Sequence, residues 1–154
     1  MAQNGRPPPT PILALDDTSL DRQLPELLAA ALAARARAYA PYSNFAVGAA
    51  LLDEHGRIHA GCNVENAAYP EGQCAEAVAL GALVMAGGTR VRAAIVAADT
   101  AGGVTPCGGC RQKLREFAEG STPVWSADAH GVIARHSLGE LLPASFGPDH
   151  LGPR

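Results

Sequence analysis

Two short cysteine-containing segments constrain the fold of this chain more than any other feature. They lie 33 residues apart and read Cys74-Ala75-Glu76 and Pro106-Cys107-Gly108-Gly109-Cys110. Together they offer three thiolates to one zinc ion, and a zinc with three protein ligands keeps its fourth position open for water. An open zinc beside a carboxylate can catalyse hydrolysis. The fold must therefore bring both segments to one point.

The spacing of the cysteines favours a shared metal over other uses. On a helix, Cys107 and Cys110 lie on one face, and Pro106 suits the helix entrance. Cys74 also opens a predicted helix, so two helix N-termini with partial positive charge would stabilise the thiolates. Cys62 falls within a predicted strand, and we interpret it as a buried small hydrophobe.

Other interpretations of these residues stay open at this point. Cys-x-x-Cys is also typical of a redox pair or of half a zinc ribbon, although a ribbon needs a second pair. A glutamate in the first turn of a helix is often only a partner of the helix dipole. Glu76 can act on metal-bound water as a general acid and base only if Cys74 is the helix cap, which is a geometric test.

Hydrophobic periodicity predicts a chain of class α/β, folded as a three-layer α-β-α sandwich with a mixed five-stranded sheet. Residues 1–17 are proline-rich and are expected to form a mobile tail, and residues 18–154 a single catalytic domain. Pro25 is placed in the first turn of the first helix. The predicted helices are 24–39, 74–85, 107–118 and 138–142, and the predicted strands are 47–52, 58–64, 91–98, 123–125 and 132–136.

Composition excludes several classes of partner. The net charge is −3 and no basic run occurs, so we expect no nucleic-acid partner. Neither a secretion signal nor a run of apolar residues long enough to span a bilayer is found, so we expect no membrane partner and a cytoplasmic location. In a reducing compartment, metal ligation is a better use of four cysteines than disulfides.

Five segments resemble the small, homotetrameric, zinc-dependent cytidine deaminases. They cover residues 38–45 (AYAPYSNF), 61–67 (GCNVENA), 74–76 (CAE), 106–112 (PCGGCRQ) and 141–148 (LLPASFGP). The resemblance implies the cytidine deaminase fold, one Zn²⁺ per subunit bound by the three cysteines of the two segments, and a nucleoside as small-molecule substrate. It also implies deamination of cytidine and deoxycytidine to uridine and deoxyuridine in pyrimidine salvage.

The resemblance further implies a mechanism and a set of binding residues. Zinc-bound hydroxide would attack C4 of cytosine while Glu76 shuttles the proton. Asn63 and Glu65 would hydrogen-bond the ribose hydroxyls, although as residues alone they look like a polar strand end. Phe45 would pack on the base, and Ala75 would offer backbone groups to it. The residues implied in contacts across subunits are Tyr42, Tyr69 and Phe146.

The chain departs from the family pattern in two places. Many of these deaminases have an arginine after Cys-Ala-Glu, whereas this chain has Ala77, and the loop 71–73 is more polar than usual. Three thiolates and Zn²⁺ sum to a charge of −1, which must be offset for water to ionise near neutral pH. We expect the two helix N-termini to offset it, with Arg111 as a second contributor.

Three alternatives compete with a nucleoside substrate. A deaminase of a cytosine-bearing antibiotic such as blasticidin S would share the cysteine segments, but Asn63 and Glu65 favour a ribose. A polynucleotide deaminase needs a basic channel or stacking aromatics, and this chain has only seven aromatic residues. A non-catalytic zinc-stabilised scaffold has no need of Glu76.

Overall fold

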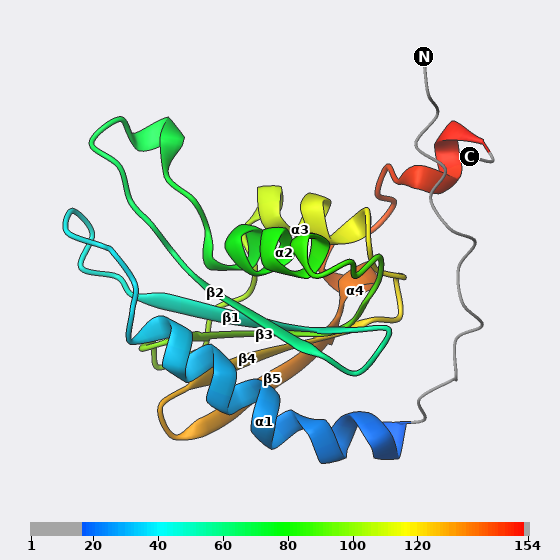
Figure 1. Cartoon of the computed structure of the whole chain (residues 1–154), viewed down its shortest axis with the longest axis horizontal. Coiled ribbons are helices and arrows are strands. Elements are labelled where there is room, and N and C mark those ends of the chain that lie inside the picture. Colours follow the sequence, from blue (N-terminus) through cyan, green and yellow to red (C-terminus); the bar gives the residue numbers. More distant parts are fainter. Residues whose placement is uncertain (1–16, 153–154) are drawn as a thin grey trace.

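The computed structural model describes residues 17–152, which form one sheet between two layers of helices (Figure 1). The elements in order are α1 (Asp17–Arg35), β1 (Val47–Asp53), β2 (Ile58–Cys62), η1 (Tyr69–Glu71), α2 (Ala75–Met85), β3 (Val91–Ala98), α3 (Gly108–Arg115), β4 (Pro123–Asp128), β5 (Gly131–Ser137), α4 (Leu138–Leu141) and η2 (Pro148–Leu151). Among the described residues, no helix combines the length and the apolar character needed to cross a bilayer.

The five strands are ordered β2-β1-β3-β4-β5. The central β3–β4 pair is parallel and every other pair is antiparallel. Helix α1 covers one face, and α2 and α3 cover the other (Figure 1). The predicted three-layer α-β-α sandwich with a mixed five-stranded sheet is therefore confirmed.

Each face of the sheet has its own hydrophobic core. On the α1 side, buried leucines and alanines of the helix pack on β1, β3 and β4, including Trp125. On the other side, α2 and α3 pack on Leu51, Ala94 and Val124. Alanine is frequent in both cores, so the helix backbones can approach the sheet closely.

Two glycines show how close the helices come. A side chain at Gly48 would meet the carbonyl oxygen of Ala31 in α1 at 2.0 Å. A side chain at Gly61 would meet the backbone nitrogen of Ala79 in α2 at 2.4 Å. No side chain fits either position, and Gly61 thereby sets the height of α2 above β2.

The first helix differs from its prediction. It begins at Asp17 instead of residue 24 and ends at Arg35, so Pro25 lies inside the helix and not in its first turn. Leu20 is buried and extends the apolar stripe toward the N-terminus. Burying this stripe offsets the backbone hydrogen bond that Pro25 cannot donate. The predicted mobile tail lies outside the described residues, except Asp17.

The second strand also ends earlier than predicted, at Cys62 instead of residue 64. Val64 forms isolated bridges with Tyr39 and Gln73, which are loop partners and not sheet partners. Asn63 and Glu65 therefore lie in a loop and not on a strand. Cys62 is half-buried, and its thiol lies 3.6 Å from the Arg37 carbonyl, so the prediction of full burial is wrong.

Candidate functional site

The structure brings together the thiols of Cys74, Cys107 and Cys110. Their sulfur atoms all lie within 4.8 Å of one another, and the Cys74 and Cys107 sulfurs are 3.8 Å apart. Tetrahedral zinc with Zn–S bonds of about 2.3 Å needs a sulfur separation of about 3.8 Å. The cluster therefore fits a zinc ion. Cys62 is not part of it.

Two helix N-termini meet at this cluster. Cys74 is the N-cap of α2 and Cys107 is the N-cap of α3, and both have extended backbone conformations. Cys110 lies in the first turn of α3 and is buried. The free backbone N–H groups and the partial positive charge of each terminus therefore face the thiols. The geometric condition set for Glu76, a cap position for Cys74, is met.

Glu76 lies in the first turn of α2 and is buried, with 5% of its surface exposed. Burial raises the pKa of its carboxyl group, while its own backbone N–H, the Cys110 thiol and the charge of Lys113 oppose that rise. A carboxyl group with few partners and a raised pKa, placed next to a metal site, is suited to taking up and releasing a proton.

The cysteine pKa values differ around the cluster. Burial raises the pKa of Cys74 and of Cys110 above that of an ordinary thiol. At Cys107 burial also acts upward, but hydrogen bonding from the Cys110 backbone and from both neighbouring thiols leaves the pKa lowered. The thiols therefore interact with one another and with Glu76 at close range, as groups that share one ion would.

A cavity of about 360 Å³ opens beside the thiols. Its lining combines two of the three predicted metal ligands and Glu76 with several predicted substrate-binding residues. These are Phe45, Asn63, Glu65, Tyr69, Cys74, Ala75, Glu76 and Cys107. Residues from the loop after β2, the start of α2 and the start of α3 thus share one cavity, whose size suits a small molecule.

Asn63 and Glu65 are held by the loop before β1. The Asn63 side chain accepts a hydrogen bond from the Val47 backbone at 2.8 Å and donates one to the Phe45 carbonyl at 2.8 Å. The Glu65 carboxylate accepts from the Tyr42 backbone N–H at 2.8 Å and from the backbone and hydroxyl groups of Ser43. The Ser43 hydroxyl and the Tyr42 N–H lower the Glu65 pKa, so this side chain is ionised.

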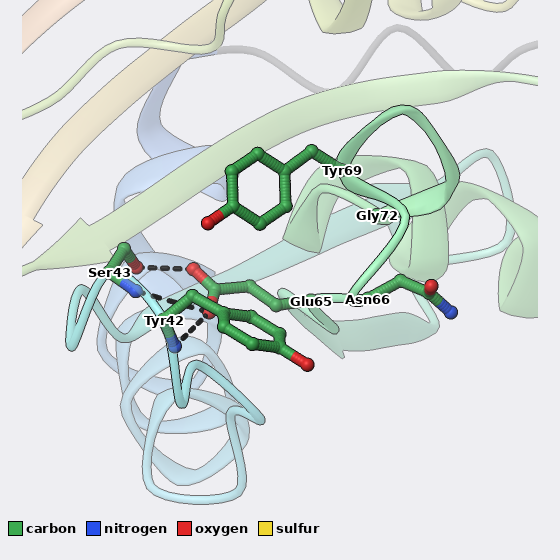
Figure 2. Close-up of a pocket in the computed structure, with 6 residues that line it drawn as sticks. All are labelled: Tyr42, Ser43, Glu65, Asn66, Tyr69 and Gly72. Atoms are coloured by element: carbon green, nitrogen blue, oxygen red, sulfur yellow. Dashed lines mark hydrogen bonds between the residues drawn. The ribbon is translucent and has the colours of Figure 1, made fainter.

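A second pocket of about 420 Å³ adjoins the first and shares Glu65, Tyr69 and Gly72 with it. Figure 2 shows the Glu65 carboxylate turned toward Ser43 and the Tyr42 backbone, with the Tyr69 ring nearby. The rings of Tyr42 and Tyr69 are 5.8 Å apart, and 75% of the Tyr69 surface is exposed. Both tyrosines therefore present apolar surface to the outside of the chain.

Phe146 lies apart from the cavity. Its ring stacks on His150 at 5.2 Å, its carbonyl accepts a hydrogen bond from Gln112 at 2.9 Å, and 59% of its surface is exposed. Within the described residues of one chain, the structure does not bring Phe146 to the other predicted site residues.

Sequence reasoning missed Val104 and Thr105, which line the cavity just before the second cysteine segment. It also missed Ser43, which holds Glu65. Ser43 lies within the segment 38–45 that carries the resemblance, and Thr105 is next to Pro106, so proximity to these segments was the available signal.

Arg111 was expected to help offset the charge of the metal centre, and that role stays a prediction. Its guanidinium donates to the carbonyls of Pro106 and Leu141 and to the hydroxyl of Thr105, which are all neutral oxygens. Lys113 is the cation whose charge acts on Glu76.

Comparison with known proteins identifies the family of this arrangement. Residues 21–125 match the family model described as "Cytidine and deoxycytidylate deaminase zinc-binding region". A cytidine deaminase of Sporosarcina psychrophila is 46% identical over 126 residues, which are 82% of this chain and 93% of that protein. One of Halalkalibacterium halodurans is 43% identical over 127 residues, covering 82% and 95% respectively.

Solved structures agree with these matches. The crystal structure of cytidine deaminase from Burkholderia pseudomallei superimposes with a TM-score of 0.74 at 44% identity, covering 79% of this chain and 97% of that chain. That of Mycobacterium tuberculosis superimposes with a TM-score of 0.70 at 40% identity, covering 80% and 96%.

Proposed function

We propose that this chain, which belongs to the family of zinc-binding cytidine and deoxycytidylate deaminases, converts cytidine and deoxycytidine to uridine and deoxyuridine. It is a zinc-dependent hydrolytic deaminase. Its cofactor is one Zn²⁺ per subunit. We place the reaction in pyrimidine salvage in the cytoplasm. The observation that carries the proposal is the burial of Glu76 in the wall of the cavity that also contains the thiols.

We assign Cys74, Cys107 and Cys110 as the zinc ligands. Bound there, zinc would act as a Lewis acid and lower the pKa of a water molecule toward neutrality. In the overall reaction, the oxygen of one water becomes O4 of the product and the amino group leaves as ammonia. The remaining tasks, which are proton transfer and substrate orientation, belong to side chains of this chain.

Glu76 is the proton carrier in this proposal. Its carboxylate accepts a proton from water, delivers it to N3 of cytosine, and assists the departure of the amine. Its buried position and raised pKa support both halves of this cycle, because a weaker acid holds the proton between the two transfers. The position of Cys74 at the helix cap supports the reach of Glu76 to the water.

Substrate orientation falls to the residues of the cavity. We assign Asn63 and Glu65 to the pentose hydroxyls, Phe45 to the face of the base, and the backbone of Ala75 to its edge. The support is that all four line the cavity. Asn63 and Glu65 are also tied to the loop before β1, which keeps their side chains in place before substrate arrives.

The exposed aromatic residues support an oligomer. We propose a homotetramer in which Tyr42, Tyr69 and Phe146 contact neighbouring subunits and complete their cavities. Each of the three is about half exposed or more in the single chain. Sedimentation equilibrium of the purified protein should give four times the chain mass of 15.8 kDa. A monomer or a dimer at enzyme concentrations would contradict this assembly.

The charge of the metal centre is tested at Ala77. We propose that the N-termini of α2 and α3 offset the net charge of −1, so that no arginine is needed at this position. Replacing Ala77 with Arg and recording the pH–rate profile tests this role. An unchanged acidic limb would show that position 77 does not tune the charge of the centre.

The decisive experiment for the reaction is ultraviolet absorbance. Purified zinc-loaded protein is incubated with cytidine, deoxycytidine and, separately, blasticidin S, and zinc content is measured on the same sample. We expect loss of the cytosine band with both nucleosides. A zinc-loaded sample that leaves both bands unchanged would refute the proposed substrates, and turnover of blasticidin S alone would assign the antibiotic instead.

A further inference from the structure

Arg111 makes a set of contacts that the reaction described above does not use. It follows the predicted ligand Cys110 in α3 and is partly buried. Its Nε donates to the Pro106 carbonyl at 2.6 Å, one terminal nitrogen to the Leu141 carbonyl at 2.8 Å, and the other to the Thr105 hydroxyl at 2.8 Å. All three acceptors are neutral oxygens, so the guanidinium acts as a fork of donors and not as half of an ion pair.

Two of the acceptors, Thr105 and Pro106, lie in the segment that delivers a metal ligand. Pro106 directly precedes Cys107, and the backbone N–H of Arg111 donates to the Cys107 carbonyl at 2.9 Å. Arg111 therefore binds two successive carbonyls, one with its side chain and one with its backbone. Cys107 is a cap residue with an extended conformation, so the helix alone does not hold the preceding peptide.

The third acceptor lies in a different element. Leu141 is the last residue of α4, and the carbonyls at the end of a helix have no partner within it. The guanidinium satisfies this carbonyl, 30 residues from Arg111, and so ties the segment before Cys107 to α4. Thr105 also lines the cavity, so the same side chain fixes part of the cavity wall.

We propose that Arg111 is a positioning residue: its guanidinium holds Thr105 and Pro106 in place and thereby sets the position of the Cys107 thiol in the metal centre. This inference rests on the zinc ligands assigned under the proposed function. Partners that orient metal ligands contribute tenfold to hundredfold to metal affinity in other proteins. A guanidinium suits this role because its donors have fixed directions, whereas an ammonium would reach fewer of the three oxygens.

The test uses two substitutions, Arg111→Met and Arg111→Lys, in the full-length protein. Zinc is removed and replaced with Co²⁺, and the thiolate-to-cobalt and d–d absorption bands are recorded. Zinc affinity is measured by competition with a chromophoric chelator. We expect Arg111→Met to shift the cobalt bands and weaken zinc binding by about tenfold to a hundredfold. Arg111→Lys should fall between this variant and the unmodified protein.

Arg115 provides the matched control on the same helix. Its Nε donates to the Ser145 hydroxyl at 3.1 Å and a terminal nitrogen to Asp149 at 2.5 Å, so its guanidinium also ties α3 to the C-terminal segment, through partners that do not flank a cysteine in the sequence. Arg115→Met should keep the cobalt spectrum and zinc affinity of the unmodified protein. If it changes them as Arg111→Met does, the effect is general loosening of α3 and the proposal is wrong.

The remaining outcomes also decide the question. Cobalt bands and zinc affinity in Arg111→Met that equal those of the unmodified protein would overturn the proposal. If Arg111→Met does not fold, unchanged values in Arg111→Lys would overturn it. Both measurements are made without substrate, so they test this inference whether or not the protein deaminates cytidine. A protein that binds metal but leaves cytidine unchanged would refute the proposed function alone.

Discussion

Two buried carboxyl groups, Asp53 and Glu76, differ sharply in how many hydrogen-bond partners they have. Asp53, at the end of β1, is fully buried and accepts four hydrogen bonds, two from backbone N–H groups, one from Arg57 and one from His59. Glu76 is almost as buried, but its charged form is favoured only by its own backbone, the Cys110 thiol and the charge of Lys113.

The pKa shifts of the two groups follow from these partners. Burial acts upward on the pKa of Asp53, but the bonds from His59 and Arg57 outweigh it and the pKa is lowered. Burial of Glu76 is not outweighed, and its pKa is raised. Asp53, with its four hydrogen bonds, stabilises the hairpin between β1 and β2. Glu76, with few partners, remains free to exchange a proton.

The largest effect is expected from Glu76→Gln. The amide keeps the size of the side chain but cannot accept and release a proton, so turnover of cytidine should fall by about a thousandfold or more, with zinc content unchanged. Glu119→Gln removes an exposed carboxylate elsewhere and should retain full activity. A fully active Glu76→Gln protein would contradict the assigned role.

Asp53→Asn should act on stability and not on chemistry. The amide oxygen can still accept from the backbone, but the bonds to Arg57 and His59 lose their charge, which costs about 2–3 kcal/mol of unfolding free energy. Urea unfolding measures this loss. Asp128→Asn is the control, because Asp128 accepts from two backbone N–H groups in the β4–β5 turn and its amide oxygen can keep both bonds, and it should change stability by less than about 0.5 kcal/mol.

The two carboxyl groups should give stability opposite dependences on pH in the metal-free protein. The lowered pKa of Asp53 contributes stability that is present above its unfolded pKa of 3.8 and is lost as pH falls through the folded pKa. The raised pKa of Glu76 contributes stability that is present below 4.5 and is lost as pH rises through the folded pKa.

Unfolding of metal-free variants across pH separates these contributions. Metal-free Glu76→Gln should exceed the unmodified protein by about 1 kcal/mol or more at neutral pH, with the difference vanishing below pH 4.5. In Asp53→Asn, the unfolding free energy should instead fall less in acid than it does in the unmodified protein. If the unfolding free energies of the two variants depend on pH in the same way, the two carboxyl groups do not differ in the direction of their pKa shifts.

The smallest effect is expected at Lys113. Its charge favours the ionised form of Glu76, but the side chain is exposed, so screening limits its influence. Lys113→Met should lower kcat/KM for cytidine by about twofold to fivefold, and the loss should shrink at high salt. Arg90→Met, which removes a cation just before β3, should have no effect; a salt-independent loss at Lys113 would point to packing instead of charge.

The sequence alone determined the sheet, the two cysteine segments and their positions at helix starts. These features depend on short-range rules, such as strand periodicity, proline before a helix and the spacing of Cys107 and Cys110. The strand 91–98 was predicted to its ends, because its run, apolar except for Arg92, is bounded on both sides by turn residues. The start of α1 was not, because it depends on the burial of Leu20 against the sheet.

Only the tertiary structure decided which partners the polar groups have. Glu65 is held by Ser43, 22 residues away, and Arg111 reaches Leu141, 30 residues away. Asp53 and Glu76 are both acidic residues near the end or start of an element. The donors to Asp53 belong to its own hairpin, whereas the side chains that act on Glu76 come from α3. Their difference arises because the folded chain surrounds one with donors and leaves the other beside the thiols with few.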